Sequence, residues 1–225
     1  MNLHYKLNKI AFKNLYDSPN VESFIFRFYG RILKYEYGIT GKNKEKILDF
    51  GCGAGANLNF FQKLFFSCYG VDISKKNINF CKSKFGLKNA KLIDIKPKKE
   101  LYFPDIKFDL CISIQTLDFI GDRDRAIVIE NIYNNLKPGG FIYVSMNSYS
   151  HYYRKFSKPY KDGLSHVKFN NGRLNYNFYC TFVENKKKLI KMFNLFKPIY
   201  VDYYDSSFRN EGSEKRYTFF GVKHK

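Results

Sequence analysis

The sequence lacks the features that mark membrane-spanning or exported proteins. No run among its 225 residues approaches the roughly 18 uninterrupted apolar residues that a membrane span needs. The first ten residues, MNLHYKLNKI, contain no apolar signal-peptide core and no small-residue cleavage site. We therefore expect a cytoplasmic protein.

Cysteine is present without a pattern. The five cysteines are odd in number, scattered, and form no CxxC pair, so neither a disulfide framework nor a zinc site is expected and no metal is predicted. A hydrophobic content of 44% can fill a sizeable core, and the length fits one large domain. Because there is no internal repeat and no clear boundary, we predict a single domain over residues 1–225.

Acidic residues are few, and the balance is strongly basic. Lys and Arg number 39 against 20 Asp and Glu, a formal net charge of +19. Such a charge can indicate binding to nucleic acid or to an anionic membrane. However, the lysines occur in small groups and never in a block of five or six, while Lys, Asn, Ile, Phe and Tyr are abundant throughout, as an AT-rich genome would produce. The net charge alone therefore does not identify a binding partner. The favoured interpretation is that it reflects drift of the overall amino-acid composition.

From residue 46 onward, short apolar runs alternate with amphipathic stretches. The apolar runs predict strands at 46–50, 68–73, 90–95, 108–114 and 141–146. The stretches between them predict helices at 56–66, 74–85 and 123–136, the last ended by the Lys-Pro-Gly-Gly that follows it. Strands that alternate with helices at this spacing predict an α/β fold with a parallel, doubly wound sheet.

The two ends of the chain differ from this pattern. Residues 1–45 are amphipathic and aromatic, which predicts one or two helices that cover the sheet or the site. Residues 147–178 have weak periodicity and predict an insertion or lid on the substrate side. A helix at 185–196 and two strands at 198–205 and 215–223 follow, and the short polar loop between those strands predicts an antiparallel hairpin at one sheet edge.

Three glycines follow the first strand of the alternating region. A strand that ends in Gly-x-Gly-x-Gly and turns into a helix brings bare backbone close to a ligand, near the positive end of that helix. Gly51, Gly53 and Gly55 have this spacing. Asp72 ends the second strand, where a carboxylate can accept hydrogen bonds from both hydroxyls of a ribose. Together these residues predict an adenosine-type nucleoside bound across the carboxyl edge of the sheet.

The glycines alone do not separate two kinds of ligand. With Ala56 they also satisfy the loosened dinucleotide pattern G-x-G-x-x-[GA], so an NAD-dependent oxidoreductase is one alternative. Three features favour S-adenosylmethionine. Asp49 suits an ammonium or sulfonium region better than a pyrophosphate, there is one nucleotide-binding half, and the chain ends in a hairpin-like pair instead of a sixth parallel strand.

Four motifs in order give a resemblance to a known family. ILDFGCGAG and GVDIS, then FDLCISIQTLDFI and NLKPGGFIYV, make the chain resemble the class I S-adenosylmethionine-dependent methyltransferases over residues 46–146, with LIDI as the segment beside the adenine. The resemblance implies a Rossmann-like seven-stranded sheet with an antiparallel last strand, and S-adenosyl-L-methionine as the cofactor. Outside residues 46–146 the resemblance is only architectural.

The resemblance also implies roles for individual residues. Asp49 would hold the methionine ammonium, directly or through water, and Asp72 would bind the ribose diol. Ile73 would lie against the adenine, Asp94 would accept from its amino group, and Gln115 would lie beneath the methyl-bearing end. The full predicted cofactor-binding set is Asp49, Gly51, Cys52, Gly53, Gly55, Asp72, Ile73, Asp94, Ile95 and Gln115.

Two residues are candidates for catalysis. Asp118, just past the fourth strand, is the predicted general base, although many relatives carry His or Glu around this point. The alternative for Asp118 is a helix cap or an ion pair with Arg123 or Arg125. His151, after the fifth strand, is the second candidate because it faces the acceptor side in this architecture. A set of aromatic residues could form a stacking wall there: Tyr149, Tyr152, Tyr153, Tyr176 and Phe178.

These observations predict a methyltransferase that acts on a small molecule. The Asn-Pro-Pro-Tyr or Asp-Pro-Pro-Tyr sequence of amino-directed enzymes is absent, and no separate RNA-binding module is apparent. We therefore expect O-methylation of a sugar, a glycan precursor such as a nucleotide- or lipid-linked sugar, or another metabolite. The alternatives are an RNA methyltransferase that uses the lysines as a phosphate track, and a non-catalytic module that binds S-adenosylmethionine.

Overall fold

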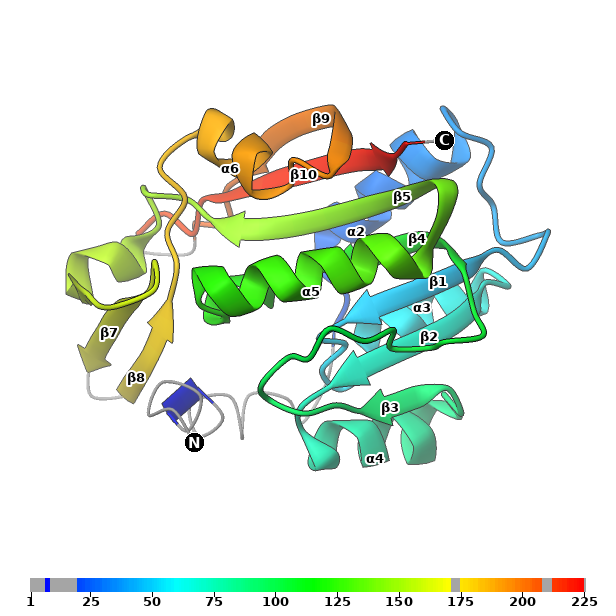
Figure 1. The fold of residues 1–225 in the computed structure, drawn as a ribbon, viewed down its shortest axis with the longest axis horizontal. Helices are drawn as coiled ribbons and strands as arrows, with labels where there is room; N and C mark the ends of the chain where they lie inside the picture. Colours follow the sequence, from blue (N-terminus) through cyan, green and yellow to red (C-terminus); the bar gives the residue numbers. More distant parts are fainter. Residues whose placement is uncertain (1–6, 9–19, 171–174, 208–211, 225) are drawn as a thin grey trace.

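The computed structural model describes residues 7–8, 20–170, 175–207 and 212–224. A seven-stranded sheet runs through the middle of the protein, with helices on both faces and a smaller sheet beyond one end (Figure 1). The rest of the predicted N-terminal segment and the tip of the last hairpin lie outside the described residues. In the part of the chain that is described, no helix has both the length and the apolar character needed to cross a membrane.

The strand order of the main sheet is β3-β2-β1-β4-β5-β10-β9. Its strands are β1 (Lys46–Phe50), β2 (Ser67–Asp72), β3 (Ala90–Leu92), β4 (Phe108–Ser113), β5 (Leu136–Asn147), β9 (Phe196–Tyr204) and β10 (Arg216–Lys223). The first five pair in parallel, whereas β10 is antiparallel to both of its neighbours. The predicted Rossmann-like sheet with an antiparallel last strand is confirmed.

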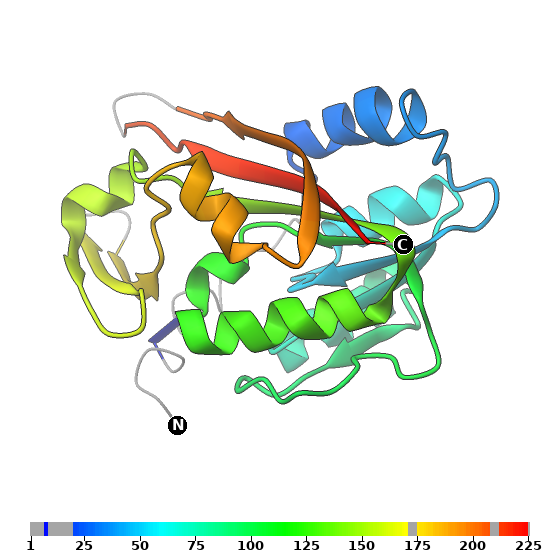
Figure 2. The same ribbon diagram turned by 45° about the horizontal axis from the view of Figure 1, so that its top comes forward.

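Helices cover the two faces of this sheet as two layers (Figure 2). The helices are α2 (Ser23–Arg27), the π-helix η1 (Phe28–Lys34), α3 (Ala56–Lys63), α4 (Lys75–Phe85), the short 3₁₀-helix η2 (Leu117–Phe119), α5 (Asp122–Asn135) and α6 (Lys186–Met192). One apolar cluster joins Phe28, Leu58 and Ile78 of η1, α3 and α4, and another joins Val128 and Leu189 of α5 and α6. Because both faces are covered, β1 and β4 are near-continuously apolar.

The N-terminal helices are held on the sheet by aromatic contacts. The ring of Phe28 stacks on that of Tyr143 in β5, with centroids 3.7 Å apart, and meets Phe220 of β10 edge-on at 5.3 Å. Aromatic pairs in such arrangements stabilise a contact beyond the area they bury, by roughly 0.5–1.5 kcal/mol. The predicted helical N-terminal extension is present within the described residues 20–45.

The predicted insertion after β5 forms a small sheet of its own. It contains the 3₁₀-helix η3 (Tyr152–Phe156) and the antiparallel strands β6 (Ser157–Pro159), β7 (Ser165–Asn170) and β8 (Asn175–Cys180). The sequence pattern indicated only weak periodicity here because these strands are short and bury only a small apolar cluster, Val167, Phe178 and Cys180. The insertion therefore adds a second wall beyond the carboxyl edge of the main sheet.

The third strand is shorter than the sequence pattern predicts. β3 ends at Leu92, and the backbone N–H of Ile93 still donates to the carbonyl of Asp72 at 3.0 Å. The chain then leaves the sheet edge, and the residues predicted to end this strand border a cavity instead.

Candidate active site

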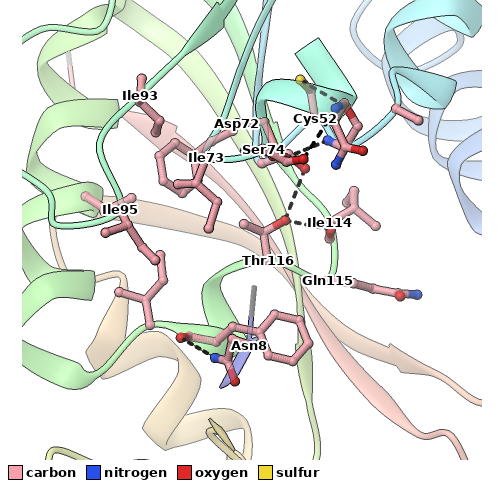
Figure 3. A pocket seen from close by; sticks show the side chains of 18 of the residues that line it. Asn8, Cys52, Asp72, Ile73, Ser74, Ile93, Ile95, Ile114, Gln115 and Thr116 are labelled. Carbon is pink, nitrogen blue, oxygen red and sulfur yellow. Dashed lines mark hydrogen bonds between the residues drawn. The ribbon is translucent and has the colours of Figure 1, made fainter. Parts of the chain in front are cut away.

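One cavity of about 780 Å³ lies at the carboxyl ends of β1, β2 and β4, where open α/β sheets bind their ligands (Figure 3). Its nucleoside end is formed by Gly53, Asp72, Ile73 and Ile93. Its acceptor end is formed by Asn8, Phe119, Tyr153, Tyr176 and Arg216. Thr116 and Ile114 lie between Asp72 and Asn8 in Figure 3.

The three glycines after β1 lack side chains for different reasons. A Cβ on Gly51 would lie 2.1 Å from Cγ2 of Thr116, and one on Gly55 would lie 2.8 Å from Sγ of Cys81. A Cβ on Gly53 would meet nothing within 4 Å, and this residue lines the cavity with a φ of +52°. Packing therefore requires two of the glycines, while Gly53 is the one that leaves open space beside the ligand site.

Asp72 is held in place by the turn that it faces. Its Oδ2 accepts the backbone N–H of Gly53 at 2.9 Å, and its Oδ1 accepts that of Ser74 at 2.7 Å. Burial raises the pKa of Asp72, although these two backbone donors oppose the shift. Each carboxylate oxygen has two acceptor sites, so both can accept a further hydrogen bond from a ligand. Asp72 lines the cavity, as a ribose-binding acid must.

Asp49 is a buried acid with the side chain of Asn57 as a polar neighbour. Its side chain is 1% exposed, and neither oxygen meets a hydrogen-bond partner in the described part of the chain. Burial, together with the neighbouring Asp72 carboxylate, raises the pKa of Asp49 to about 8. Asp49 is not itself among the lining residues, but Phe50 and Gly51, which follow it, are. Burial without a partner favours the protonated carboxyl, and a ligand ammonium would instead stabilise its ionised form.

An apolar wall stands beside Asp72. Ile73, Ile93 and Ile95 gather on one side of the cavity in Figure 3, where a flat ring can lie against them. Asp94 also lines the cavity, but its carboxylate is largely exposed and forms an ion pair with Lys98 at 3.0 Å. Cys52, from the glycine turn, lines the cavity too, whereas Gly55 does not.

Gln115 lines the cavity in an unusual backbone conformation. Its φ is +52°, which costs a residue with a side chain roughly 1–2 kcal/mol. Its backbone N–H donates to Oγ of Ser145 at 3.1 Å, and its Nε2 donates to Oε1 of Glu22 at 3.3 Å. Strained residues of this kind concentrate at binding sites, and the predicted role of Gln115 beneath the methyl-bearing end stays a prediction.

Asp118 lies behind the cavity wall. It is fully buried, its Oδ1 accepts the backbone N–H of Asn147 at 2.6 Å, and its Oδ2 lies 3.5 Å from Nη1 of Arg216. Burial raises the pKa of Asp118 to about 6, and the charge of Arg216 opposes the shift. Asp118 is not among the residues that line the cavity. Its role as a general base therefore stays a prediction that no contact supports, and its ion pair is with Arg216 instead of the expected Arg123 or Arg125.

His151 is also buried and outside the cavity lining. It is 1% exposed, and its Nδ1 accepts the backbone N–H of Tyr153 at 3.2 Å, so it caps η3. Burial, together with the charge of Arg216, lowers the pKa of His151 to about 3. The ring is therefore neutral, and its catalytic role likewise stays a prediction.

The acceptor end contains residues that the sequence reasoning missed. Arg216, Phe119 and Asn8 line it, together with Tyr153 and Tyr176 from the predicted aromatic set. The Asn8 side chain exchanges two hydrogen bonds with the backbone of Tyr179, at 2.7 and 2.9 Å. No local pattern identifies such residues, because their partners lie far away in the chain. The other members of the predicted wall, Tyr149, Tyr152 and Phe178, do not line the cavity.

Comparison with known proteins identifies the part of the chain that builds the nucleoside end. Residues 48–144 match the family model described as the methyltransferase domain. This part of the chain is a class I methyltransferase domain. The predicted family, its α/β fold and S-adenosylmethionine as its cofactor are confirmed. Arg216 and the small sheet lie outside the matched range.

Two relatives match part of the chain at moderate identity. An uncharacterized protein of Rickettsia prowazekii is 28% identical over 152 residues, which cover 64% of this chain and 60% of that protein. A ubiquinone biosynthesis O-methyltransferase of Pelagibacter ubique is 33% identical over 102 residues, 44% of this chain and 41% of that enzyme. The matches thus span less than two thirds of either relative.

A solved structure agrees over more of the chain. A SAM-dependent methyltransferase from Methanosarcina mazei superimposes with a TM-score of 0.68 and 18% identity, covering 92% of this chain and 99% of that one. At this identity the likeness establishes the fold, including the strands outside the family-model match.

Proposed function

We propose that the protein transfers a methyl group from S-adenosylmethionine to an oxygen of a small molecule, such as a sugar, a glycan precursor or another metabolite. The observation that carries this proposal is the single cavity that joins Gly53 and Asp72 to the aromatic side chains of Tyr153 and Tyr176. Its volume of about 780 Å³ lies within the usual range of small-molecule sites, roughly 300–1,000 Å³. A cytoplasmic location is part of the same proposal.

The residues of the nucleoside end fit the cofactor. Gly53 leaves room for the ligand, Asp72 would bind the ribose hydroxyls, and the unpaired carboxyl of Asp49 would hold the ammonium, directly or through water. When bound, the cofactor supplies a methyl group already activated by its sulfonium. The remaining work of the chain is to orient the acceptor oxygen and exclude water, which can contribute roughly 7–11 kcal/mol in well-aligned systems.

The residues of the acceptor end are placed to orient the acceptor, whereas none of those that the structure describes is placed as a general base. Tyr153, Tyr176 and Phe119 offer ring faces and edges against which a planar or ring-shaped acceptor can pack. Asp118 reaches this end only through Arg216. We therefore propose Asp118 as a positioning residue for Arg216 and not as the group that removes a proton from the acceptor.

RNA methylation is the second candidate. It is favoured by the net charge of +19 and by four lysines that line the cavity near its nucleoside end, Lys75, Lys76, Lys96 and Lys98. Phosphate contacts release counterions, so RNA binding would weaken steeply as salt rises. Binding to short RNA that is weak and insensitive to salt would remove this candidate.

The test of the proposed function uses an isotopically methyl-labelled donor. The protein is incubated with the labelled donor and cell extract, once with small metabolites only and once with purified RNA, and the products are identified by mass spectrometry. We expect label in a small molecule at an oxygen atom. Label confined to RNA would establish the second candidate, and the absence of label with any fraction would contradict both. The Asp72→Ala variant serves as the control for label that does not depend on the cavity.

A further inference from the structure

Arg216 brings a cation to the acceptor end from a distant part of the chain. It is the first residue of β10 and pairs across the sheet with Asn147 of β5. Its side chain is nearly buried, with 7% of its surface exposed, yet it lines the same cavity as Tyr153 and Tyr176. A cation this deeply buried requires partners for its N–H groups.

Only part of the Arg216 guanidinium has such partners. Nη1 donates to Oδ1 of Asn147 at 2.5 Å and lies 3.5 Å from Oδ2 of Asp118. Nε is buried and has no hydrogen-bond partner within the described chain. Asn147 and Asp118 therefore hold one nitrogen of the guanidinium, Nη1, while Nε–H has no acceptor within the described chain.

A second unpaired donor lies near Arg216. Nδ1 of His151 accepts the N–H of Tyr153, so the proton of the neutral ring is on Nε2. Nε2 is buried and also lacks a partner among the described residues. The backbone N–H of His151 donates to the carbonyl of Ser148 at 3.0 Å, and that of Ser148 donates to the carbonyl of Lys215 at 3.1 Å, so the loop of His151 lies beside the start of β10. This region thus has two hydrogen-bond donors without acceptors. An oxygen atom of a bound ligand would supply the missing acceptor.

We infer that the methyl acceptor carries an anionic oxygen group, a carboxylate or a phosphate, that binds the guanidinium of Arg216. The inference rests on the proposed function. The planar guanidinium matches both groups in geometry, and hydrogen bonds between ionised partners are stronger than neutral ones. His151 is not in the cavity lining, so it would support Arg216 from behind and not contact the acceptor.

The charges around Arg216 reduce the positive electrostatic field at the acceptor end. Asp118 compensates part of the guanidinium charge, and the carboxylate of Glu214, which also lines the cavity, accepts a hydrogen bond from Oγ of Ser206 at 3.1 Å. The acceptor end therefore has no large positive field, and an anion would be held by directed hydrogen bonds. Its binding should consequently depend less on salt than that of RNA to the lysines.

The experiment compares three probes that share one ring and differ in a single group. Benzoate carries a carboxylate, phenyl phosphate carries a phosphate, and phenol carries neither charge at neutral pH. Each is titrated by calorimetry into protein saturated with S-adenosylhomocysteine, and the binding of S-adenosylhomocysteine itself is measured first. Competition by inorganic phosphate shows whether the phosphate group is recognised without the ring.

The variants are chosen so that the effect of losing the guanidinium on binding can be distinguished from an effect on folding stability. Arg216→Met alone would leave the Asp118 carboxylate buried without its cation, which destabilises proteins strongly. The main variant is therefore Arg216→Met combined with Asp118→Asn, and Asp118→Asn alone keeps the guanidinium. Arg154→Met removes the same charge from an exposed residue that stacks on Tyr149, and it is the matched control.

We expect the wild type to bind benzoate or phenyl phosphate at least about tenfold more tightly than phenol. Tighter binding of benzoate would identify the anionic group of the acceptor as a carboxylate, and tighter binding of phenyl phosphate would identify it as a phosphate. The double variant should lose this preference, Asp118→Asn should reduce it because Arg216 loses its positioning partner, and Arg154→Met should keep it. Equal binding of charged and neutral probes by the wild type, or a preference that survives in the double variant, would overturn the inference. If S-adenosylhomocysteine does not bind at all, the proposed function fails instead.

Discussion

The two ends of the cavity are built in different ways. The nucleoside end comes from a continuous part of the sheet, in which the Gly53 backbone and the Asp72 carboxylate hold each other across two adjacent strands. The acceptor end comes from an N-terminal residue, the loop after β4, the inserted sheet and the start of β10. Each end also has a buried ionisable group with unpaired atoms, an acid at Asp49 and a base at Arg216. The nucleoside end suits one constant ligand, whereas the acceptor end can vary with its substrate.

The largest effect is expected within the glycine turn. In Gly51→Ala the new Cβ would overlap Thr116 at a positive φ, so we expect the free energy of unfolding to fall by about 2–4 kcal/mol. In Gly53→Ala nothing is overlapped, so the loss of stability should be only about 1–2 kcal/mol from the backbone. The Gly53 variant should instead bind S-adenosylmethionine more weakly. Urea unfolding and calorimetry on both variants would show the contrast, and equal losses of stability would contradict it.

The next effect is on cofactor affinity. Asp72→Ala removes the hydrogen bonds to the ribose hydroxyls, and because the loss of one hydrogen bond to a charged group costs roughly 1.5–3 kcal/mol, S-adenosylmethionine should bind at least about 10- to 100-fold more weakly. Calorimetry measures the affinity, and circular dichroism checks that the fold is retained. The Arg216→Met/Asp118→Asn variant, at the other end of the cavity, should bind the cofactor normally. An unchanged affinity in Asp72→Ala would remove this residue from the site.

A smaller effect depends on pH and concerns Asp49. Because its folded pKa is about 8, Asp49 is mostly protonated at neutral pH, whereas the cofactor ammonium favours the ionised form. Binding should therefore release a proton, and affinity should rise as the pH increases from about 6 to about 8. Asp49→Asn should bind about tenfold more weakly at the upper pH and lose this dependence. Calorimetry in buffers of different ionisation enthalpy measures the proton release, and an identical pH profile in the variant would exclude Asp49 as its source.

The raised pKa of Asp49 should also affect how the stability of the ligand-free protein depends on pH. The folded pKa of Asp49 lies above the value of an unfolded aspartate, so the folded state binds the proton more tightly. Its contribution to stability is present at low pH and is lost as the pH rises through about 8. Comparing the pH dependence of urea unfolding in the wild type and in Asp49→Asn isolates this contribution.

The smallest effect is expected at Asp94. Its carboxylate is exposed and paired with Lys98, and exposed pairs contribute about 0–1 kcal/mol. Asp94→Asn should therefore change cofactor affinity by less than about fivefold. A loss of affinity as large as that of Asp72→Ala would show that the Asp94 carboxylate binds the adenine amino group directly. Asp94 would then belong to the residues that bind the nucleoside.

The strands and helices that could be predicted are those whose apolar faces are covered within the main sheet. β1 and β4 are near-continuously apolar because both of their faces are buried, and α5 has a helical periodicity because one of its faces is buried. The inserted strands β6 to β8 could not be predicted, since they are short and their buried residues form only a small cluster that shows no regular alternation along the chain. The same difference applies to the site. Asp72 is recognisable by its spacing from the glycines, whereas Asn8 acquires its role only by contact with Tyr179.

By itself, the sequence determined the strand–glycine–helix turn, the acid after β2 and hence the nucleoside end, because these features depend on residues close together in the chain. The tertiary structure alone decided that Gly53 faces the ligand site, that Gly51 is required by Thr116, and that Asp118 lies behind Arg216. These properties arise from side chains brought together across strands β4, β5 and β10. Spacing along a chain carries no information about such contacts, since burial and pairing there are set by the packing of the whole sheet.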